Sequence, residues 1–271
     1  MKIKYLGILA VTLASVFSFS CKKDNSIQVI DLPLDAANNA RIKYFNFAAG
    51  APSVNFYANG VKVSGILSAT GAENAAGTGY GAVYPASNYS AIAGGTYKIN
   101  GIIPSTATAN ANVSISEISP VLANGKYYSL YTSGIYNATT KTAESFVLED
   151  VLPASSASNM VSYVRFVNAI PNGTGPMNLV IKNSITAVEM VVATNVAYKT
   201  GSAFVAVPIG SYELYVRYPG SSTNLISRNG TTNGVVSFFG GRTNTVGARG
   251  DMTITSATAT NRPLLDNTAN Q

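Results

Sequence analysis

Histidine and tryptophan are absent from the 271-residue sequence, and cysteine occurs once, as Cys21. Without histidine the chain lacks the commonest general base and the commonest metal ligand, which excludes Ser-His-Asp and Cys-His catalytic sites. A single cysteine cannot form a disulfide within the chain. These absences argue against an enzyme, and the sequence predicts no catalytic residue, no metal site and no cofactor.

Charged residues are scarce too, at 11% of the chain, whereas hydrophobic residues make up 46%. Glycine and tyrosine are frequent, with 24 and 16 copies, and no stretch beyond the N-terminus shows a helical stripe of apolar residues. This mixture of strand formers and turn formers predicts an all-β protein. The basic residues form no run, so a nucleic-acid partner is not expected.

The N-terminus has the pattern of a secretory signal. Lys2 and Lys4 precede an uncharged, mostly apolar run over residues 5–20, which ends at Cys21. Sixteen residues are too few for a transmembrane helix, which needs about 20, but they suit the apolar region of a signal peptide. The cysteine after Ser20 resembles the lipobox of bacterial lipoproteins, although Ser18 stands where that motif usually has an aliphatic residue.

That resemblance implies cleavage before Cys21 and acylation of the cysteine, which would anchor the protein to a membrane. Cleavage would leave 16 basic and 12 acidic residues, a net charge of about +4 instead of +6. By the same resemblance, Lys22 after the cysteine favours the outer membrane, with the periplasmic or the surface face left open. The alternatives are an uncleaved signal anchor, or ordinary cleavage that leaves a free thiol.

A five-residue pattern occurs twice in the remaining chain. Residues 42–46, Ile-Lys-Tyr-Phe-Asn, return as residues 164–168, Val-Arg-Phe-Val-Asn, and both read apolar, basic, aromatic, apolar, Asn. Later landmarks recur in the same order, namely Gly95-Thr96-Tyr97 with Gly210-Ser211-Tyr212, and Gly125-Lys126 with Gly241-Arg242. Ordered landmarks at similar spacing indicate a duplication followed by changes in loop length.

The repeat predicts two tandem antiparallel β-sandwich domains, immunoglobulin-like or transthyretin-like, after the signal peptide. We expect Asn46 and Asn168 to hydrogen-bond backbone where the first strand of each copy ends. The predicted segments are a signal peptide (1–20), the lipidated cysteine and a flexible tether (21–39), a first sandwich (40–152), a linker (153–159), a second sandwich (160–256) and a C-terminal tail (257–271). The tail is expected to fray, with Leu264-Leu265 as a candidate late contact.

Two local patterns predict strand pairs. Asn59-Gly60 between residues 54–58 and 61–63 indicates a hairpin with a type I′ turn. Gly94-Gly95 between residues 89–92 and 96–100 suggests a second pair. The small, glycine-rich stretch 68–81 should be a mobile loop or a ragged sheet edge. Its Gly77-Thr78-Gly79-Tyr80-Gly81 lacks the following helix that a phosphate-binding loop needs.

These landmarks together resemble the bacterial domain of unknown function 4397. The family's opening strand matches Arg165-Phe166-Val167-Asn168-Ala169 closely and Lys43-Tyr44-Phe45-Asn46-Phe47 more loosely. Its later hairpin, Gly-Thr/Ser-Tyr and Gly-Lys-Tyr-Tyr patterns are all present in the first copy, and the second copy is more divergent. The resemblance implies lipid-anchored envelope β-sandwich modules, often in tandem, and brings no catalytic residues.

Tyrosine is the residue type best suited to a ligand platform, because its flat ring stacks on sugars and its hydroxyl bonds them. Tyr80, Tyr84 and Tyr89 gather in the loop-rich part of the first copy and are the candidate platform. Most strand tyrosines, however, are packing residues. For glycoside hydrolysis two carboxylates must face one cleft, and the candidates are Glu117, Glu144 and adjacent Glu149-Asp150.

The sequence therefore predicts a non-catalytic, lipid-anchored cell-envelope protein that acts as a structural or adhesion-type interaction module. Its expected partners are the membrane, through Cys21, and a glycan or another envelope protein. A carbohydrate-binding accessory lipoprotein that uses exposed tyrosines is the alternative, and a carboxylate-based glycoside hydrolase is the remote one. The sequence does not define the ligand or the oligomeric state.

Overall fold

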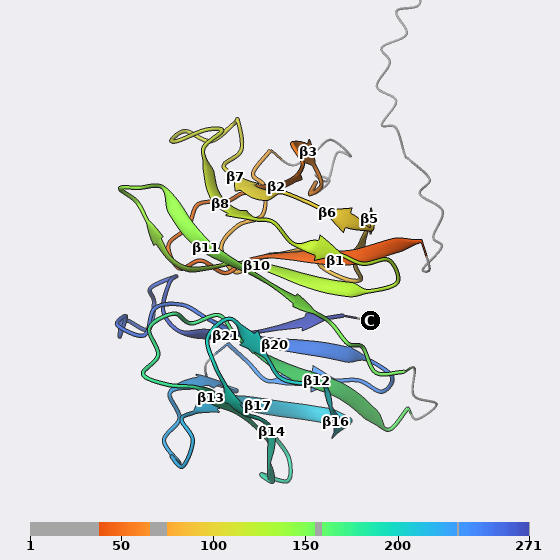
Figure 1. Cartoon of the computed structure of the whole chain (residues 1–271). Helices are drawn as coiled ribbons and strands as arrows, with labels where there is room; N and C mark the ends of the chain where they lie inside the picture. The colour runs from red at the N-terminus through yellow and green to blue at the C-terminus, as the bar shows by residue number, and fades with distance from the viewer. Residues whose placement is uncertain (1–37, 66–74, 155–158, 232, 271) are drawn as a thin grey trace, which may run out of the picture. The chain divides into compact units, whose positions relative to one another are not determined.

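A computed structural model describes residues 38–65, 75–154, 159–231 and 233–270, and over these residues the chain consists of strands, turns and loops without a helix. Twenty-one strands, β1–β21, pair into five sheets, and Figure 1 shows their arrangement. The prediction of an all-β protein with sandwich-type folding is confirmed. The described residues all fall within one compact unit, Asp35–Gln271.

The strands before residue 154 make the first sandwich. One sheet has the order β11-β10-β1-β4, with β5 also on β1, a second has the order β3-β2-β7-β8, and β6 pairs with β9. The strands are β1 (Asn39–Asn46), β2 (Asn55–Ala58), β3 (Val61–Lys62), β4 (Val83–Tyr84), β5 (Ser90–Ala93), β6 (Gly95–Thr96), β7 (Ile99–Ile102), β8 (Ser114–Ile118), β9 (Val121–Leu122), β10 (Tyr127–Asn137) and β11 (Thr142–Glu149).

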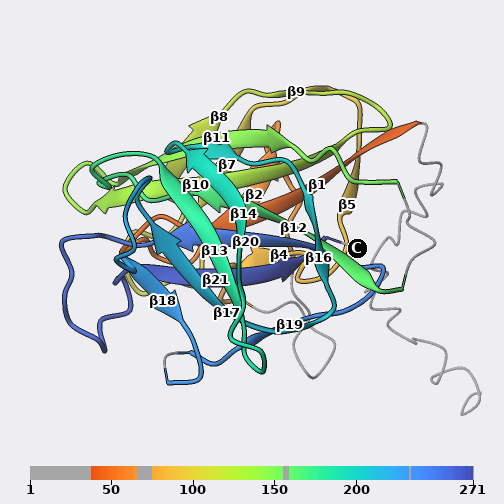
Figure 2. The same cartoon turned by 90° about the horizontal axis from the view of Figure 1, so that it is seen from below.

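The strands after residue 159 make the second sandwich. Its sheets have the orders β15-β12-β20-β21, with β16 also on β12, and β14-β13-β17-β18, with β19 also on β17. Strands β13 and β17, which are neighbours in the second of these sheets, lie side by side in the turned view of Figure 2. The strands are β12 (Val161–Asn168), β13 (Met177–Asn183), β14 (Glu189–Val196), β15 (Thr200–Gly201), β16 (Val205–Pro208), β17 (Gly210–Arg217), β18 (Ile226–Arg228), β19 (Val236–Phe238), β20 (Thr243–Arg249) and β21 (Leu264–Ala269).

Each sandwich contains one parallel strand pair, which departs from the expected purely antiparallel arrangement. Residues 41–46 of β1 pair in parallel with residues 127–132 of β10, and residues 163–168 of β12 pair in parallel with residues 243–248 of β20. All other strand pairs are antiparallel in the described part of the chain. Alternation of apolar residues shows which face of a strand is buried but not its direction, so the sequence does not reveal the parallel pairs.

Two further expectations about strands need correction. The strands around Gly94-Gly95 do not pair with each other, because β5 pairs with β1 whereas β6 pairs with β9 and β7 with β2. The chain crosses between the layers here, as it does at Gly210 between β16 and β17. The fraying tail expected over 257–271 is wrong for Leu264–Ala269, because β21 pairs with β20 and buries Leu265. The Asn59-Gly60 turn is confirmed, with φ of 50° and 81°.

Each sandwich has its own apolar core, and the strands with the duplicated pattern contribute to both cores in the same way. Ile42 and Tyr44 of β1 lie in the first core, and Val164 and Phe166 of β12 lie in the second. Successive side chains of a strand point to opposite faces, so the residues between them point away from the core of their own sandwich.

Candidate functional site

The intervening residues of the duplicated pattern meet at the junction between the two sandwiches. Lys43 and Phe45 on β1, and Arg165 and Val167 on β12, are 0–2% exposed although they face away from their own cores. Both faces of β1 and β12 are therefore buried. The basic residue of the pattern lies at the junction in both copies.

The apolar part of the junction is a cluster rich in aromatic rings. Phe45 stacks on Tyr131 with ring centroids 4.3 Å apart, and Tyr131 stacks on Phe146 at 4.7 Å. Val167 and Ala169 of the second sandwich belong to the same buried cluster. Stacked rings of this size bury large apolar areas, and each pair adds about 0.5–1.5 kcal/mol beyond that burial.

The polar part of the junction is centred on an ion pair between Arg165 and Asp150. Arg165 Nη2 lies 2.5 Å from Asp150 Oδ1, and the side chains are 3% and 0% exposed. Asp150 Oδ2 also accepts hydrogen bonds from Ser129 Oγ at 2.6 Å and Tyr89 Oη at 2.7 Å. Arg165 Nε donates to Thr245 Oγ1 at 2.9 Å. The buried carboxylate and guanidinium are thus paired with each other and hydrogen-bonded to further groups. Burying either charge without such partners would be costly.

The network reaches the last described strand and the other basic residue. Thr245 Oγ1 donates to Asn270 Oδ1 at 2.8 Å, and Asn270 Nδ2 donates to Tyr89 Oη. Lys43 Nζ donates to the carbonyl oxygen of Ala269 at 2.7 Å and lies 5.3 Å from the centroid of the Tyr89 ring. Strands β1, β10, β12, β20 and β21 and the end of β11 are therefore joined by one set of buried polar contacts.

Burial shifts the ionisation of these groups. It lowers the pKa of Lys43 to about 8, against an upward effect of the Asp150 charge. Burial raises the pKa of the Tyr89 phenol, and Asp150 raises it further. For Arg165, burial acts downward, but the Asp150 carboxylate and neighbouring tyrosines outweigh it and leave the pKa above its ordinary value. Arg165 therefore stays cationic.

The asparagine side chain of the pattern forms hydrogen bonds with the backbone in both copies, as predicted. Asn46 Nδ2 donates to the carbonyl oxygens of Pro52 and Thr78, each at 3.0 Å. Asn168 Nδ2 donates to the Val196 carbonyl at 3.1 Å, and its Oδ1 accepts from the Ile170 amide at 3.0 Å. Each asparagine thus fixes the loop that leaves the first strand of its sandwich.

The three tyrosines of the candidate platform do not share a surface. The ring of Tyr80 lies 4.4 Å from the guanidinium carbon of Arg249, and Tyr89 is bonded to Asp150. Tyr84, on β4, packs against the core of the first sandwich. All three side chains are half-buried, and every tyrosine within the described residues is buried or half-buried.

The candidate catalytic carboxylates are each held by a cation. Glu117 pairs with Lys98 at 2.9 Å and Glu149 with Lys126 at 2.7 Å. Glu144 pairs with Lys199 at 2.5 Å, and Asp150 pairs with Arg165. Adjacent Glu149 and Asp150 take opposite faces of the chain, one exposed and one buried. Each of the four acids therefore has a different cation as its partner, and none is paired with another acid.

The part of the glycine-rich stretch that the structure describes is fixed. Thr78 and Val54 exchange backbone hydrogen bonds of 2.7 and 3.0 Å, and Gly81 N donates to Asn46 O at 2.7 Å. A Cβ on Gly77, whose φ is +68°, would lie 2.9 Å from the Val54 carbonyl oxygen. Of the two expectations for this stretch, a mobile loop or a ragged edge, the isolated bridge between Val54 and Thr78 agrees with the ragged edge.

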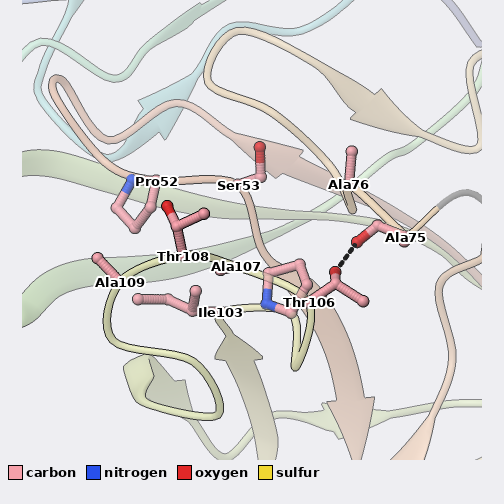
Figure 3. A pocket seen from close by; sticks show the side chains of 10 residues that line it. Pro52, Ser53, Ala75, Ala76, Ile103, Thr106, Ala107, Thr108 and Ala109 are labelled. Atoms are coloured by element: carbon pink, nitrogen blue, oxygen red, sulfur yellow. Dashed lines mark hydrogen bonds between the residues drawn. The ribbon is translucent and has the colours of Figure 1, made fainter.

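A cavity of about 540 Å³ borders this stretch (Figure 3). Small side chains line it, from residues 52–53, 75–76, 103–104 and 106–109, and Thr106 Oγ1 donates to the Ala75 carbonyl at 2.8 Å. None of the described residues that line this cavity is ionisable, so the cavity has no group that could act as an acid or a base.

A second cavity, of about 610 Å³, opens beside the junction. Its apolar lining includes Leu152, Tyr163 and Phe204, and Arg165 lies 4.8 Å from the centroid of the Phe204 ring. Its charged side chains already have partners, since Arg165 is bonded to Asp150 and Glu149 to Lys126.

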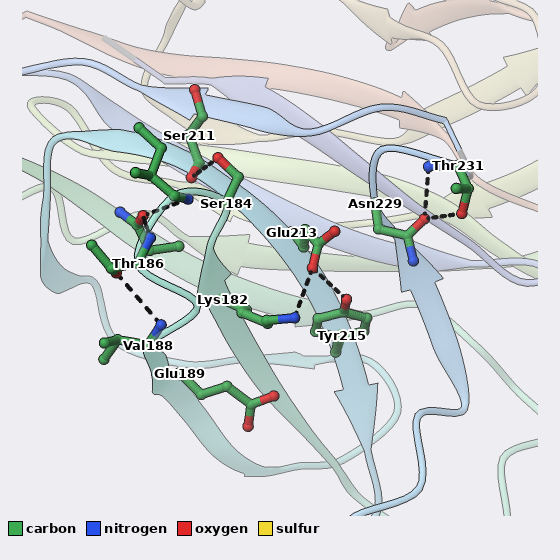
Figure 4. A network of polar contacts seen from close by, with 12 residues as sticks. Lys182, Ser184, Thr186, Val188, Glu189, Ser211, Glu213, Tyr215, Asn229 and Thr231 are labelled. Atoms are coloured by element: carbon green, nitrogen blue, oxygen red, sulfur yellow. Dashed lines mark hydrogen bonds and ion pairs between the residues drawn. The ribbon is translucent and has the colours of Figure 1, made fainter.

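Polar contacts also cover the outer sheet of the second sandwich (Figure 4). Lys182 Nζ lies 3.5 Å from Glu213 Oε2, which accepts a hydrogen bond from Tyr215 Oη at 2.6 Å. Arg217 binds both oxygens of Glu189, at 2.7 and 2.8 Å. These pairs lie at the surface, so each adds about 1 kcal/mol or less to stability.

The junction can join and orient two sandwiches, but its charged side chains and the Ser129 hydroxyl are buried. Ser129 Oγ donates to a carboxylate, as in some nucleophilic sites, yet Ser129 is 0% exposed and out of reach of a substrate. Within the described ranges no three acidic, histidine or cysteine side chains gather to hold a metal ion, and no helix has the length and apolarity to cross a bilayer. Cys21, the predicted lipidation site, lies outside the described residues.

The sequence contains an incomplete signal for the junction. The pattern repeats a basic residue between two core positions of a strand, which marks Lys43 and Arg165 as unusual. Nothing in the sequence identifies Asp150, Ser129 or Asn270 as their partners.

Comparison with known proteins finds one family model that matches part of the chain. Residues 40–174 match the model of a domain of unknown function, DUF4397. The match extends past the predicted linker and includes β12, the first strand of the second sandwich. A search among curated proteins finds no match.

Two solved structures show a low similarity to the chain. The Bacillus anthracis TIE protein is 12% identical, with a TM-score of 0.20, over 74% of this chain and 31% of that one. A leucine-rich repeat protein from Bacteroides thetaiotaomicron is 14% identical, with a TM-score of 0.20, over 79% of this chain and 26% of that one. The chain spans less than a third of the length of either structure.

Proposed function

We propose that the protein is a non-catalytic, lipid-anchored component of the bacterial cell envelope in which two sandwiches form one stiff structural or interaction module. The buried Arg165–Asp150 network carries this proposal, because it commits charged groups to joining the sandwiches. Separation of the sandwiches would break this pair together with the hydrogen bonds from Lys43 to Ala269 and from Asn270 to Tyr89.

The second sandwich is, in this proposal, a second and more divergent copy of the family domain. Its support is the repeated parallel pairing, β1 with β10 and β12 with β20, and the repeated use of Lys43 and Arg165 at the junction. Membrane attachment would be through acyl chains, including palmitate, on Cys21, at the outer membrane.

Labelling cells with a palmitate analogue tests the anchor. The full-length protein should carry the label and float with membranes, and Cys21→Ala should lose the label. A labelled Cys21→Ala protein would contradict lipidation at this residue, whereas an unlabelled wild type would contradict lipidation altogether.

A carbohydrate-binding accessory role has less support, because the described tyrosines are at least half-buried. A carboxylate-based hydrolase has less still, because the four candidate acids are ion-paired. Glycan-array screening of the mature protein separates these roles: saturable binding to a defined glycan would displace the structural proposal, and its absence would support it.

A further inference from the structure

Five large apolar side chains are exposed on the loop tips at one end of the second sandwich. Their exposed fractions are 89% for Ile185, 68% for Phe239, 67% for Met160, 65% for Val188 and 42% for Ile209. They come from the segment before β12, the β13–β14 turn, the β16–β17 link and the turn after β19. Single exposed apolar residues are ordinary on protein surfaces, but a group on adjoining loops marks an interaction surface. We name these five residues the loop-tip patch.

The loops of the patch adjoin one another. Ile209 N donates to the Met160 carbonyl at 3.1 Å, which joins the segment before β12 to the β16–β17 link. Gly210 pairs in register with Phe238, so Ile209 and Phe239, which precede and follow them, are neighbours. A Cβ on Gly210 would lie 3.3 Å from Asn183 Nδ2, at the base of the β13–β14 turn. The patch is therefore continuous across the loops.

The turn that carries the most exposed residue is held in place by side-chain hydrogen bonds. Asn183 Oδ1 accepts from the amides of Ile185 and Thr186, both at 2.9 Å. Ser184 Oγ donates to the Ser211 carbonyl at 2.9 Å (Figure 4). The apolar side chains are thus presented on a fixed backbone, which limits the entropy lost when a surface covers them.

The patch lies at the end of the unit where the described chain begins. Near the start of the two strands, Lys43 of β1 contacts Ala269 of β21, and Ala269 pairs with Asn244 of β20. Further along, Phe47, which follows β1, lies against Gly247 of β20. Strands β1 and β20 therefore run in the same direction across the junction. The start of β1 and the turn that carries Phe239 and precedes β20 consequently lie at the same end.

We propose that the loop-tip patch rests on the surface of the lipid bilayer that holds the protein, an inference that depends on the proposed anchor at Cys21. Seventeen residues separate Cys21 from Asn39. The tether expected there would span about 20–25 Å, which allows this end of the unit to reach the bilayer. Arg242, exposed in the same turn as Phe239, suits anionic headgroups. Apolar side chains flanked by a cation are typical of interfacial binding.

The absence of tryptophan provides a clean probe. Full-length lipidated Phe239→Trp is reconstituted into vesicles of phosphatidylethanolamine and phosphatidylglycerol whose acyl chains carry bromine, a contact quencher of tryptophan. The matched control is Ile135→Trp, because Ile135 is also apolar and 47% exposed but lies near the opposite end of β10. Emission from the Phe239→Trp protein should shift to shorter wavelength and be quenched, and emission from the Ile135→Trp protein should show neither change.

Substitution of Met160 and Ile209 by serine in the Phe239→Trp protein should reduce the quenching while flotation with the vesicles persists. Equal, weak quenching of both tryptophan variants in proteins that float would overturn the patch and leave the anchor standing. Failure to float would overturn the anchor, and the patch with it. A blue shift of the Phe239→Trp protein that grows with protein concentration without lipid would also overturn the proposal, in favour of contact with a second copy.

Discussion

Replacing Asp150 by asparagine is expected to destabilise the protein severely, because it leaves the buried Arg165 charge without a counter-ion. Both side chains are at most 3% exposed, and the carboxylate accepts hydrogen bonds from Arg165, Ser129 and Tyr89. Breaking a buried pair in this way costs about 3–5 kcal/mol. For a unit of this size each kcal/mol lowers Tm by about 2–4 °C, so Asp150→Asn should lower Tm by about 6–20 °C.

The assay is urea and thermal unfolding followed by near-ultraviolet circular dichroism, with Glu117→Gln as the control. Glu117 pairs with Lys98 at the surface, where both side chains are more than half exposed, so its loss should change Tm little. The double variant Arg165→Met with Asp150→Leu should recover much of the loss, because it removes both charges together. If Asp150→Asn were as stable as Glu117→Gln, the argument that the junction depends on this ion pair would be refuted.

Two further predictions concern the same junction. Folding lowers the pKa of Lys43 to about 8, so the unfolded chain binds the extra proton between about pH 8 and pH 10.5, and this group should raise stability over that window by about 2–3 kcal/mol. Urea unfolding at several pH values should show that the free energy of unfolding rises more steeply with pH in the wild type than in Lys43→Met. Equal slopes would contradict the role assigned to Lys43. Gly247→Ala should cost about 1–3 kcal/mol, because its Cβ would lie 2.6 Å from the buried Phe47 ring. Gly175→Ala, with no atom within 4 Å, is the control in thermal unfolding, and equal Tm values would show that the Phe47 ring yields freely.

Local sequence patterns predict the strands well where one physical signal dominates. Alternation in Gly210–Arg217 predicts β17, and the structure buries Tyr212, Leu214 and Val216. Asn59-Gly60 predicts its turn because both residues must adopt positive φ. The prediction that the asparagines of the duplicated pattern bond backbone is confirmed, since amide side chains readily serve that purpose at strand ends.

Features that depend on distant parts of the chain cannot be predicted in this way. Strand β21 has one fully buried apolar residue, Leu265, which is too weak a signal to distinguish it from a tail. Asp150 and Glu149 are adjacent in the sequence and suggest a catalytic pair, although neighbouring strand residues point apart. The actual partner of Asp150, Arg165, lies in the other sandwich, and only the packing of the two sandwiches brings them together.

The candidate tyrosine platform illustrates the same limit. Tyr80 and Tyr89 lie close in the sequence, but their neighbours in space are Arg249 and Asp150. Both side chains cover or bond charged groups. Composition shows that tyrosine is abundant, but the surroundings of each ring decide whether it can meet a ligand.

The parallel pairing of β1 with β10 and the hydrogen bond from Lys43 to Ala269 can form only after much of the following chain is available. The latter joins residues 226 positions apart, and contacts between such distant residues are slow to form. A chain that emerges N-terminus first leaves the β1 backbone unpaired on the β10 side until β10 has emerged. The Lys43 ammonium gains its carbonyl partner only after β21 has followed. Until β10 pairs with it, β1 has an open strand edge, the kind of surface on which chains aggregate and chaperones act.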